Sequence, residues 1–368
     1  MSATPPTSLD LISLVRREVR DLPSYVPATG AAKKPDRLIR LDMNESPFGP
    51  SPRTRAALAD FVQTNRYPDF AQSALRSALS EYTGVPVEQI ICGAGLDDVF
   101  TSLAHLLIEP GDEVVISEPT FGVYRPLFSM HGANVVNVPL SPDFELMPEQ
   151  VIAAVNDRTK LVIICSPNNP TGNLFAQEAI ESICANARCL VAIDEAYAEF
   201  AGVSQIPLMD RFPNVMVLRT MSKWAGLAGM RVGYGLVPKE LVGAIGHVVP
   251  PFHNVALASS EAAVAAIDDR DFLMKQVGVI CEFRDALLAD IEQINGLQPL
   301  PTVTNFILVR TQLPDARPLV QAISERGVLI RGYGDPLLQP YFRVTVGHPE
   351  ENDRFLLALR ESIEEILA

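Results

Sequence analysis

The sequence predicts an α/β protein with a large domain, in which helices cover both faces of a mostly parallel sheet, and a smaller α+β domain. From about residue 71 to about residue 238, short and almost wholly apolar runs alternate with segments of helical spacing. Such runs are typical of parallel strands that are buried on both faces. After about residue 255 the order changes to a long helical run followed by strands and helices, which favours a second domain.

The elements follow one another in a regular order along the large domain. Residues 71–84 have helical spacing and end in a glycine, and residues 97–112 form a helical segment that ends in Pro-Gly. The spacing predicts a further helix over residues 124–133. Apolar strands, each ended by a polar or glycine-rich turn, are expected within residues 89–95, 113–119, 134–140, 161–172, 189–197, 215–223 and 232–238.

The second domain has a different layout. A helical run over residues 256–294 leads into strands within 305–311 and 341–347, with helices between and after them. Near the N-terminus, residues 9–19 predict a short amphipathic helix. We therefore expect three parts: an N-terminal arm that packs with the small domain (residues 1–40), a large domain (41–255) and a small C-terminal α+β domain (256–368).

The composition argues against several classes of partner. The 368 residues carry a net charge of −14 and 48% of them are hydrophobic; an acidic chain of this kind repels nucleic acid and anionic lipid. No run of about 18 apolar residues predicts a membrane span, and the N-terminus lacks the apolar core of a signal peptide. The five cysteines show no Cys-x-x-Cys spacing and the five histidines are scattered. We therefore expect reduced thiols, no metal site and a cytoplasmic location.

In a parallel α/β sheet, ligands bind beyond the carboxyl ends of the strands, so the residues after each strand are the most informative. Gly93-Ala94-Gly95 leads from a strand into a helix, where free N–H groups could bind a phosphate. A plain tight turn is the other interpretation. The sequence contains neither G-x-G-x-x-G nor G-x-x-x-x-G-K-[ST], which counts against nicotinamide nucleotides and ATP.

Polar side chains follow three further strands. Asn169 follows the first of these strands, Asp194 and Tyr197 the second, and Lys223 the third, with Arg231 eight residues beyond the lysine. Taken singly, Asp194 could only cap a helix and Asn169 could only form a turn. Together they form the set that pyridoxal phosphate needs. The lysine binds its aldehyde, the acid pairs with its ring nitrogen, and hydroxyls, N–H groups and an arginine hold its phosphate.

The chain resembles the fold-type-I pyridoxal-phosphate aminotransferases, and among them it is most similar to histidinol-phosphate aminotransferase and its close relatives. The resemblance covers nearly the whole chain. It rests on the segments "DLPSYVPA", "LDMNESPFGP", "NRYPD", "GAGLDD", "EPTFGVY", "SPNNPTG", "IDEAYAEF", "RTMSKWAGLAGMRVGYG", "LIRGYG" and "FRVTVGHPEEND". It implies the fold of the type I pyridoxal-phosphate transferases, pyridoxal 5'-phosphate as the cofactor and an obligate homodimer.

The resemblance implies roles for residues around the cofactor ring. Lys223 would hold the cofactor covalently and move a proton during catalysis, and Asp194 would keep the ring nitrogen protonated. Asn169 and Tyr197 would hydrogen-bond the phenolic oxygen of the ring. Phe121 would stack on the ring face, where many relatives have a tyrosine. The catalytic residues implied in this way are Lys223, Asp194 and Tyr197.

The resemblance also implies two sets of ligand contacts. The cofactor phosphate would be held by Gly95, Leu96, Asp97, Thr220, Ser222 and Arg231, and by Tyr67 of the neighbouring subunit. The substrate would contact Tyr25, Asn44, Asn169, Arg331 and Arg343, and Arg343 would clamp its acidic group. Two positions depart from the family pattern. Leu96 stands where a serine is frequent, so that contact would come from backbone N–H groups, and Ser46 replaces the second asparagine of Asn-Glu-Asn-Pro.

The implied activity is transamination between histidinol phosphate and 2-oxoglutarate, a step of histidine biosynthesis. Two alternatives stay open: an aminotransferase for phenylalanine or tyrosine, and a threonine-phosphate decarboxylase that would use the same lysine and aspartate. A non-catalytic regulator is disfavoured, because Lys223 is present, the chain is acidic and no length is left for a DNA-binding domain. Trp224 is expected to contribute packing.

Overall fold

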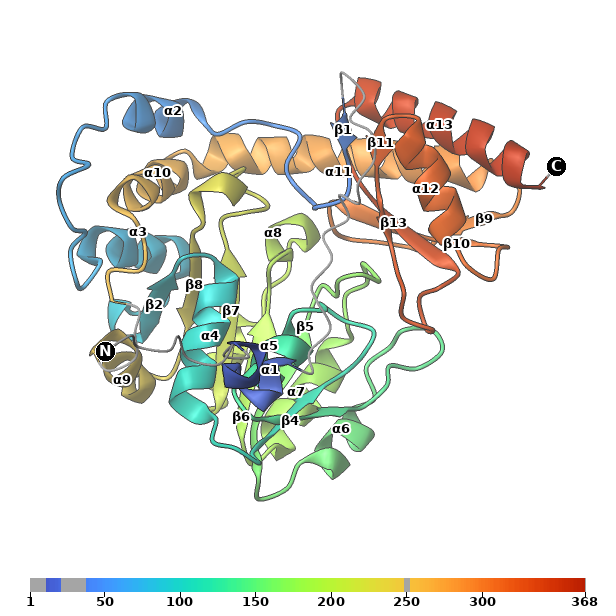
Figure 1. The fold of residues 1–368 in the computed structure, drawn as a ribbon. Coiled ribbons are helices and arrows are strands. Elements are labelled where there is room, and N and C mark those ends of the chain that lie inside the picture. Colours follow the sequence, from blue (N-terminus) through green and yellow to red (C-terminus); the bar gives the residue numbers. More distant parts are fainter. Residues whose placement is uncertain (1–10, 21–37, 248–251, 368) are drawn as a thin grey trace, which may run out of the picture.

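The computed structural model describes residues 11–20, 38–247 and 252–367. These residues form a larger unit on a seven-stranded sheet and a smaller unit on a four-stranded sheet. Figure 1 shows that the longest helix, α11 (Arg270–Glu292), runs across both units. None of the helices described combines the length and the apolar composition that a membrane crossing requires.

The large sheet has the strand order β2-β8-β7-β6-β5-β3-β4. β8 is antiparallel to both of its neighbours, and the other pairs are parallel. The prediction of a mostly parallel sheet is therefore confirmed. The strands are β2 (Ile90–Gly93), β3 (Glu113–Ile116), β4 (Asn134–Asn137), β5 (Thr159–Cys165), β6 (Leu190–Asp194), β7 (Val215–Thr220) and β8 (Gly233–Leu236).

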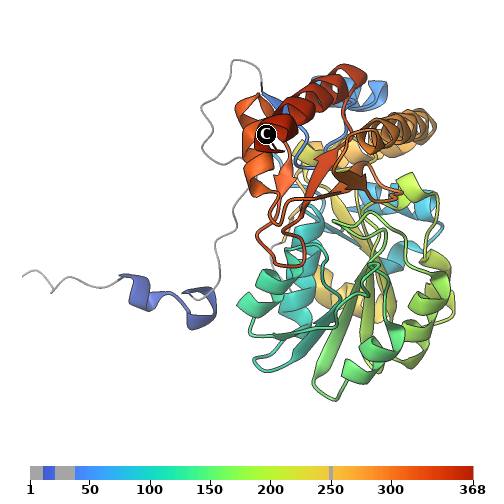
Figure 2. The same cartoon turned by 90° about the vertical axis from the view of Figure 1, so that its right-hand side faces the viewer.

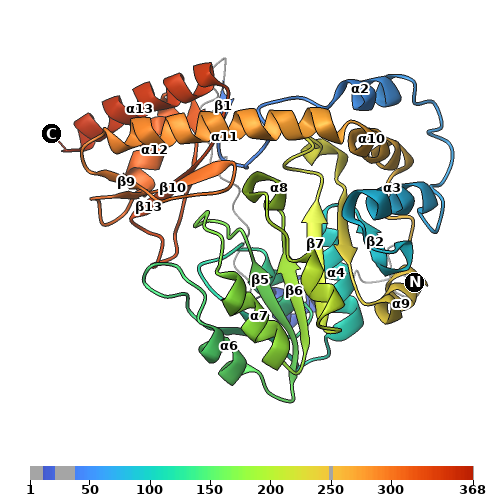
Figure 3. The ribbon, with the colours of Figure 1, turned by 180° about the vertical axis from the view of Figure 1, so that it is seen from behind.

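Helices cover both faces of this sheet, which explains why its strands are almost wholly apolar. Leu161 and Ile163 of β5 belong to the core formed with α4 and α5. Val162 and Ile164 point the other way and belong to the core formed with α6 and α7, because successive residues of a strand face opposite sides. Figure 3 shows α6 and α7 on the nearer face. The four helices are α4 (Leu96–Leu107), α5 (Tyr124–Met130), α6 (Pro148–Ala154) and α7 (Gln177–Asn186).

The large unit also contains α3 (Ser73–Thr83), α8 (Ala198–Ala201) and α9 (Lys239–His247). α3 ends as predicted: Gly84 has a φ of 75°, and its N–H donates to the carbonyl of Ser80. A glycine suits this left-handed conformation because it has no Cβ.

The helical run predicted over residues 256–294 is helical but divided. α10 (Leu257–Asp268) and α11 meet at Asp269, whose carboxylate accepts a hydrogen bond from the N–H of Arg53 at 2.9 Å. α10 packs against α2 (Pro52–Ala59) and α3 rather than against the small sheet. The contacts at α10 therefore depart from the expected division at residue 255, and α11 is the element that leads into the small unit.

The small unit has the antiparallel strand order β12-β13-β10-β9. Its core contains Ile307, Val309, Phe342, Val344 and Phe355. A separate parallel pair joins β1 (Ile39–Arg40) to β11 (Val328–Leu329). The remaining elements are β9 (Leu297–Pro299), β10 (Phe306–Thr311), α12 (Arg317–Glu325), β12 (Arg331–Gly332), β13 (Tyr341–Thr345) and α13 (Pro349–Leu367).

The described part of the N-terminal arm departs from expectation. The helix predicted over residues 9–19 appears as a 3-10 turn, Leu11–Leu14, and one α-helical turn, α1 (Arg17–Arg20). Arg16 Nη2 donates to the carbonyl of Met130 in α5 at 3.0 Å, so this segment contacts the large unit, beside which Figure 2 shows it. Among the described residues of the arm, β1 contacts the small unit through its pairing with β11.

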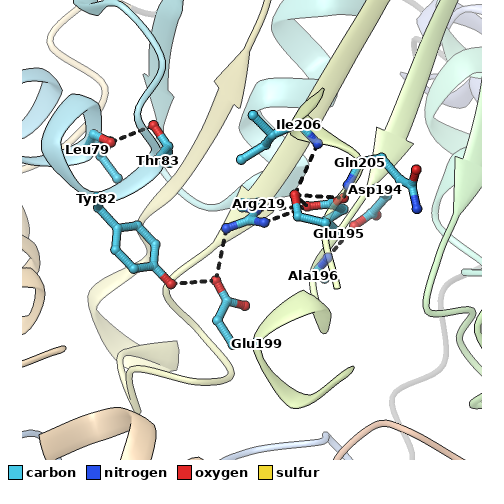
Figure 4. A network of polar contacts seen from close by, with 11 residues as sticks. Leu79, Tyr82, Thr83, Asp194, Glu195, Ala196, Glu199, Gln205, Ile206 and Arg219 are labelled. Carbon is cyan, nitrogen blue, oxygen red and sulfur yellow. Dashed lines mark hydrogen bonds and ion pairs between the residues drawn. The ribbon is translucent and has the colours of Figure 1, made fainter. Parts of the chain in front are cut away.

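A buried cluster of charged side chains, Arg219, Glu195 and Glu199, lies near the carboxyl ends of β6 and β7. Arg219 donates to Oε2 of Glu195 from Nε at 2.9 Å and from Nη2 at 2.7 Å. Its Nη1 reaches Glu199 Oε1 at 3.5 Å, and the Tyr82 hydroxyl donates to the same oxygen at 3.0 Å (Figure 4). Trp224 stacks on the Tyr82 ring at 5.2 Å, which bears out its expected packing role. The cluster joins β6, β7, α3 and α8 through side chains.

Replacing Arg219 with methionine would leave Glu195 buried without its cation. An uncompensated buried charge of this kind costs about 3–5 kcal/mol, so we expect the free energy of unfolding, measured by denaturant titration, to fall by about that amount. Arg317→Met is the matched control, because its ion pair with Asp315 lies on the surface and such pairs contribute little. An Arg219→Met protein no less stable than this control would contradict the prediction.

Candidate active site

A cavity of about 300 Å³ opens at the carboxyl edge of the large sheet, where ligands of α/β proteins bind. A second cavity of about 640 Å³ adjoins it, shares Lys223 and Arg231 with it, and extends to Arg331 and Arg343 of the small unit. The first cavity is lined by side chains that include Phe121, Asp194, Thr220, Ser222, Lys223 and Arg231. The structure thus brings together residues that lie far apart in the sequence.

Lys223 lies between the two cavities. Its Nζ donates to the carbonyl of Met43 at 2.9 Å. Desolvation, and then the nearby guanidinium groups of Arg343 and Arg231, lower the pKa of Lys223 to about 8, because both effects disfavour the charged amine. A substantial fraction of this amine is therefore neutral near physiological pH.

Asp194 ends β6 and is buried, with only 3% of its surface exposed. Its Oδ2 accepts a hydrogen bond from the Tyr124 hydroxyl at 2.5 Å, and its Oδ1 accepts one from the N–H of Ala196 at 3.0 Å. Burial raises the pKa of Asp194 to about 6, although both hydrogen bonds oppose the rise. A carboxylate in this position is stabilised by a cationic partner.

Tyr124 is a site residue that the sequence interpretation missed. It begins α5 three residues after Phe121 and is fully buried, with the rings of Phe121 and Phe100 edge-on to its own. The available signal was its place within "EPTFGVY", a segment that also supplies Phe121. Nothing in the local sequence shows that this hydroxyl reaches Asp194.

The start of α4 forms a concave cradle against Arg231. Gly95, the N-cap of α4, has a φ of 87° and no side chain that caps the helix. A Cβ at Gly95 would lie 2.2 Å from Arg231 Nη2, so only a glycine allows this approach. The hydroxyls of Thr220 and Ser222 lie 3.0 Å apart and also line the cavity. Free helix N–H groups, hydroxyls and a guanidinium together suit a phosphate.

Apart from Tyr67, the other predicted contact residues in the described part of the chain line one or both of these cavities. The Tyr197 hydroxyl accepts a hydrogen bond from Asn44 Nδ2 at 2.8 Å. Asn169 Oδ1 accepts one from Arg343 Nη1 at 2.6 Å. Leu96 and Asp97 line the first cavity at the start of α4, and Asp97 Oδ2 lies 3.6 Å from Arg231 Nη2.

The small unit contributes two arginines on adjacent strands. Arg331 of β12 and Arg343 of β13 are direct partners in the strand register, so both side chains leave the same face of that sheet. Arg343 is buried; its Nη2 donates to the backbone carbonyl of Asp42 at 2.7 Å, and its guanidinium lies 5.3 Å from the ring centre of Phe306.

Two predicted residues are not placed at the site. Tyr67 is 87% exposed, packs its ring against His253 at 5.4 Å and lines neither cavity in this chain. Tyr25 lies outside the described residues. Within the ranges that the structure describes, no group of three or more His, Cys, Asp or Glu side chains could hold a metal ion.

The residues present fit pyridoxal phosphate. Gly95 lacks the Cβ that would collide with Arg231, so the guanidinium lies against the N-terminus of α4, where both can contact an anion. A buried carboxylate and a lysine of lowered pKa border the same cavity. These are the groups that would hold a phosphate, a protonated ring nitrogen and an aldehyde, respectively.

Known proteins resemble this chain over nearly its full length. The sequence model described as aminotransferase class I and II matches residues 36–359. The histidinol-phosphate aminotransferase of Roseiflexus castenholzii is 39% identical over 367 residues, which cover 95% of this chain and 98% of that protein. The enzyme of the same name from Dehalococcoides mccartyi is 37% identical over 354 residues, covering 96% and 98%.

The structural comparison agrees with the sequence comparison. The crystal structure of histidinol-phosphate aminotransferase from Sinorhizobium meliloti, in complex with pyridoxal-5'-phosphate, superposes with a TM-score of 0.89 at 28% identity. The match covers 96% of this chain and 98% of that one. Together, the matches establish that this chain belongs to the class I and II aminotransferases.

Proposed function

We propose that this protein is a pyridoxal-phosphate-dependent aminotransferase that moves the amino group of histidinol phosphate to 2-oxoglutarate. One observation carries the proposal: Lys223 and Asp194 border one cavity, and the adjoining cavity ends at Arg343 and Arg331. The first pair suits the cofactor and the second suits the acidic end of a substrate. The relatives named above support histidinol phosphate as the amino donor.

The cofactor, when bound, draws electrons from the substrate's α-carbon. Lys223 holds the central role among the protein's own groups. The lowered pKa makes the neutral form of its Nζ accessible near physiological pH. In that form, Nζ takes the proton from the α-carbon and releases it again later in the reaction. General acid–base transfer of this kind contributes roughly 10²–10⁴-fold to the rate.

Asp194, Asn169 and Tyr197 orient and charge the site. The ionised Asp194 pairs with the protonated ring nitrogen, while Tyr124 keeps its carboxylate in place. When the cofactor is bound, Asn169 and Tyr197 would hydrogen-bond its phenolic oxygen, and Phe121 would cover one face of the ring. Its phosphate would be held by Thr220, Ser222, Arg231 and the backbone of Gly95–Asp97.

We infer that the working form is a homodimer. Tyr67, Phe70 and Phe252 are exposed by 87%, 41% and 47%. The rings of Tyr67 and Phe70 pack against His253, and Phe252 packs against Phe70. An exposed aromatic cluster of this kind is typical of an interface. It supports the interpretation that Tyr67 reaches the cofactor phosphate of a second copy.

The proposed location is the cytoplasm, where thiols such as the free cysteines found here stay reduced.

The substrate assignment can be tested with three donors offered separately with 2-oxoglutarate: histidinol phosphate, phenylalanine and threonine phosphate. We expect glutamate to form fastest with histidinol phosphate and no CO2 to be released, because the two arginines match a phosphate. A preference for phenylalanine of more than tenfold would favour the aromatic aminotransferase. Release of CO2 from threonine phosphate would favour the decarboxylase.

Replacing Lys223 with alanine should abolish turnover, since the proton carrier and the covalent attachment are lost together. We expect a fall in kcat of about 10²–10⁴-fold or more. Treatment with borohydride should fix the yellow cofactor to the wild type and not to the variant, which mass spectrometry of the peptides would show. Lys239→Ala, at an exposed lysine of α9, serves as the control. Wild-type rates in Lys223→Ala would refute the assignment.

The lowered pKa of Lys223 predicts a pH dependence for the apoenzyme. The neutral amine is the form that attacks an aldehyde, and its fraction grows as the pH rises through the pKa of about 8. The rate of pyridoxal phosphate uptake, followed by absorbance, should therefore rise with pH and level off above about 8. An unperturbed lysine would give a rise that continues to about pH 10.4. Such a continued rise would contradict the assigned environment.

A further inference from the structure

We propose that Tyr333 is a specificity-determining residue for the amino donor: its hydroxyl donates a hydrogen bond to the donor's phosphate beside Arg343. The inference deepens the proposed function and rests on it. Tyr333 lies in the segment between β12 and β13 and lines the 640 Å³ cavity with Arg331 and Arg343.

The strand register places the two arginines side by side, and the cavity lining brings Tyr333 to them. Arg331 and Arg343 are partners across β12 and β13, and Gly332 pairs with Phe342. Tyr333 directly follows β12 and lines the same cavity as both arginines. Both arginines also influence the phenol electrostatically, which agrees with their proximity.

The Tyr333 hydroxyl forms no hydrogen bond with any residue that the structure describes. Its oxygen is buried, and Arg343 Nε is likewise buried and without such a bond. Buried polar groups are almost always paired, and leaving one unpaired is costly. Burial raises the pKa of Tyr333, although the arginines oppose the rise. The phenol therefore keeps its proton and acts as a donor.

Four acidic side chains line this cavity: Asp42, Asp97, Glu118 and Asp335. Asp97 Oδ2 lies 3.6 Å from Arg231 Nη2, and burial raises the pKa of Asp42. Glu118 accepts two hydrogen bonds from Arg125, at 3.0 and 2.8 Å. Asp335 Oδ1 accepts one from the N–H of Leu337 at 2.8 Å. A ligand with several acceptor oxygens and negative charge fits the remaining donors, and a phosphate presents both.

Tyr333→Phe removes the hydroxyl and keeps the ring. We expect the KM for histidinol phosphate to rise about tenfold or more, as for a lost bond to a charged group, while kcat stays within about twofold. Histidinol, which lacks the phosphate, should react equally with wild type and variant. Inorganic phosphate, used as a competitive inhibitor, should bind the variant about tenfold more weakly.

Tyr341→Phe is the matched control, because its ring packs edge-on against Phe144 and it does not line the cavity. It should leave all of these constants unchanged. An unchanged KM in Tyr333→Phe, or an equal loss with histidinol and histidinol phosphate, would overturn the inference. If the wild type does not transaminate histidinol phosphate, the proposed function fails and this inference with it. If the wild type does and only the Tyr333→Phe result is negative, the inference alone fails.

Discussion

The burial of the Asp194 carboxylate is the constraint on which the arrangement of the site depends. A carboxylate at the end of a central strand is destabilised unless donors or a cation surround it. Tyr124 and the N–H of Ala196 supply donors. Asp194 lines a cavity with room for a cationic ligand, and none of the ion pairs among the described residues involves it. The Asp194 carboxylate and a protonated ring nitrogen would therefore stabilise each other, because each supplies the opposite charge.

A second buried carboxylate, that of Glu195, lies at the same edge of the sheet, but it is paired within the protein. Glu195 follows Asp194, and its carboxylate lies behind the site, where Arg219 and the hydroxyl of Ser204 neutralise and bind it. Two adjacent acids thus have different surroundings: one pairs fully within the protein and the other faces a cavity. This alternation follows from the period of two along an extended chain, which sends neighbouring side chains to opposite faces.

The sequence predicted the large sheet well, because its strands are buried on both faces and read as uninterrupted apolar runs. Asp194 and Lys223 could be singled out because both follow such runs, where parallel strands present their carboxyl ends. Contacts between distant residues could not be predicted: Tyr124 is 70 residues from Asp194, and Asn169 is 174 residues from Arg343. The break at Asp269 was also invisible, since the helical spacing continues through it and only packing of α10 on α2 and α3 separates the helices.

Arg343 belongs to the small unit, yet it holds Asn169 of the large unit and the backbone of Asp42, which follows β1. The guanidinium that would recognise an acidic substrate therefore also connects the small unit to the large unit. An anion that draws this guanidinium toward itself competes with the hydrogen bonds to Asn169 and to the Asp42 carbonyl. The free energy of anion binding is therefore reduced by the free energy of the contacts that are lost. By linkage, the factor by which a bound anion weakens these two contacts equals the factor by which the contacts weaken anion binding.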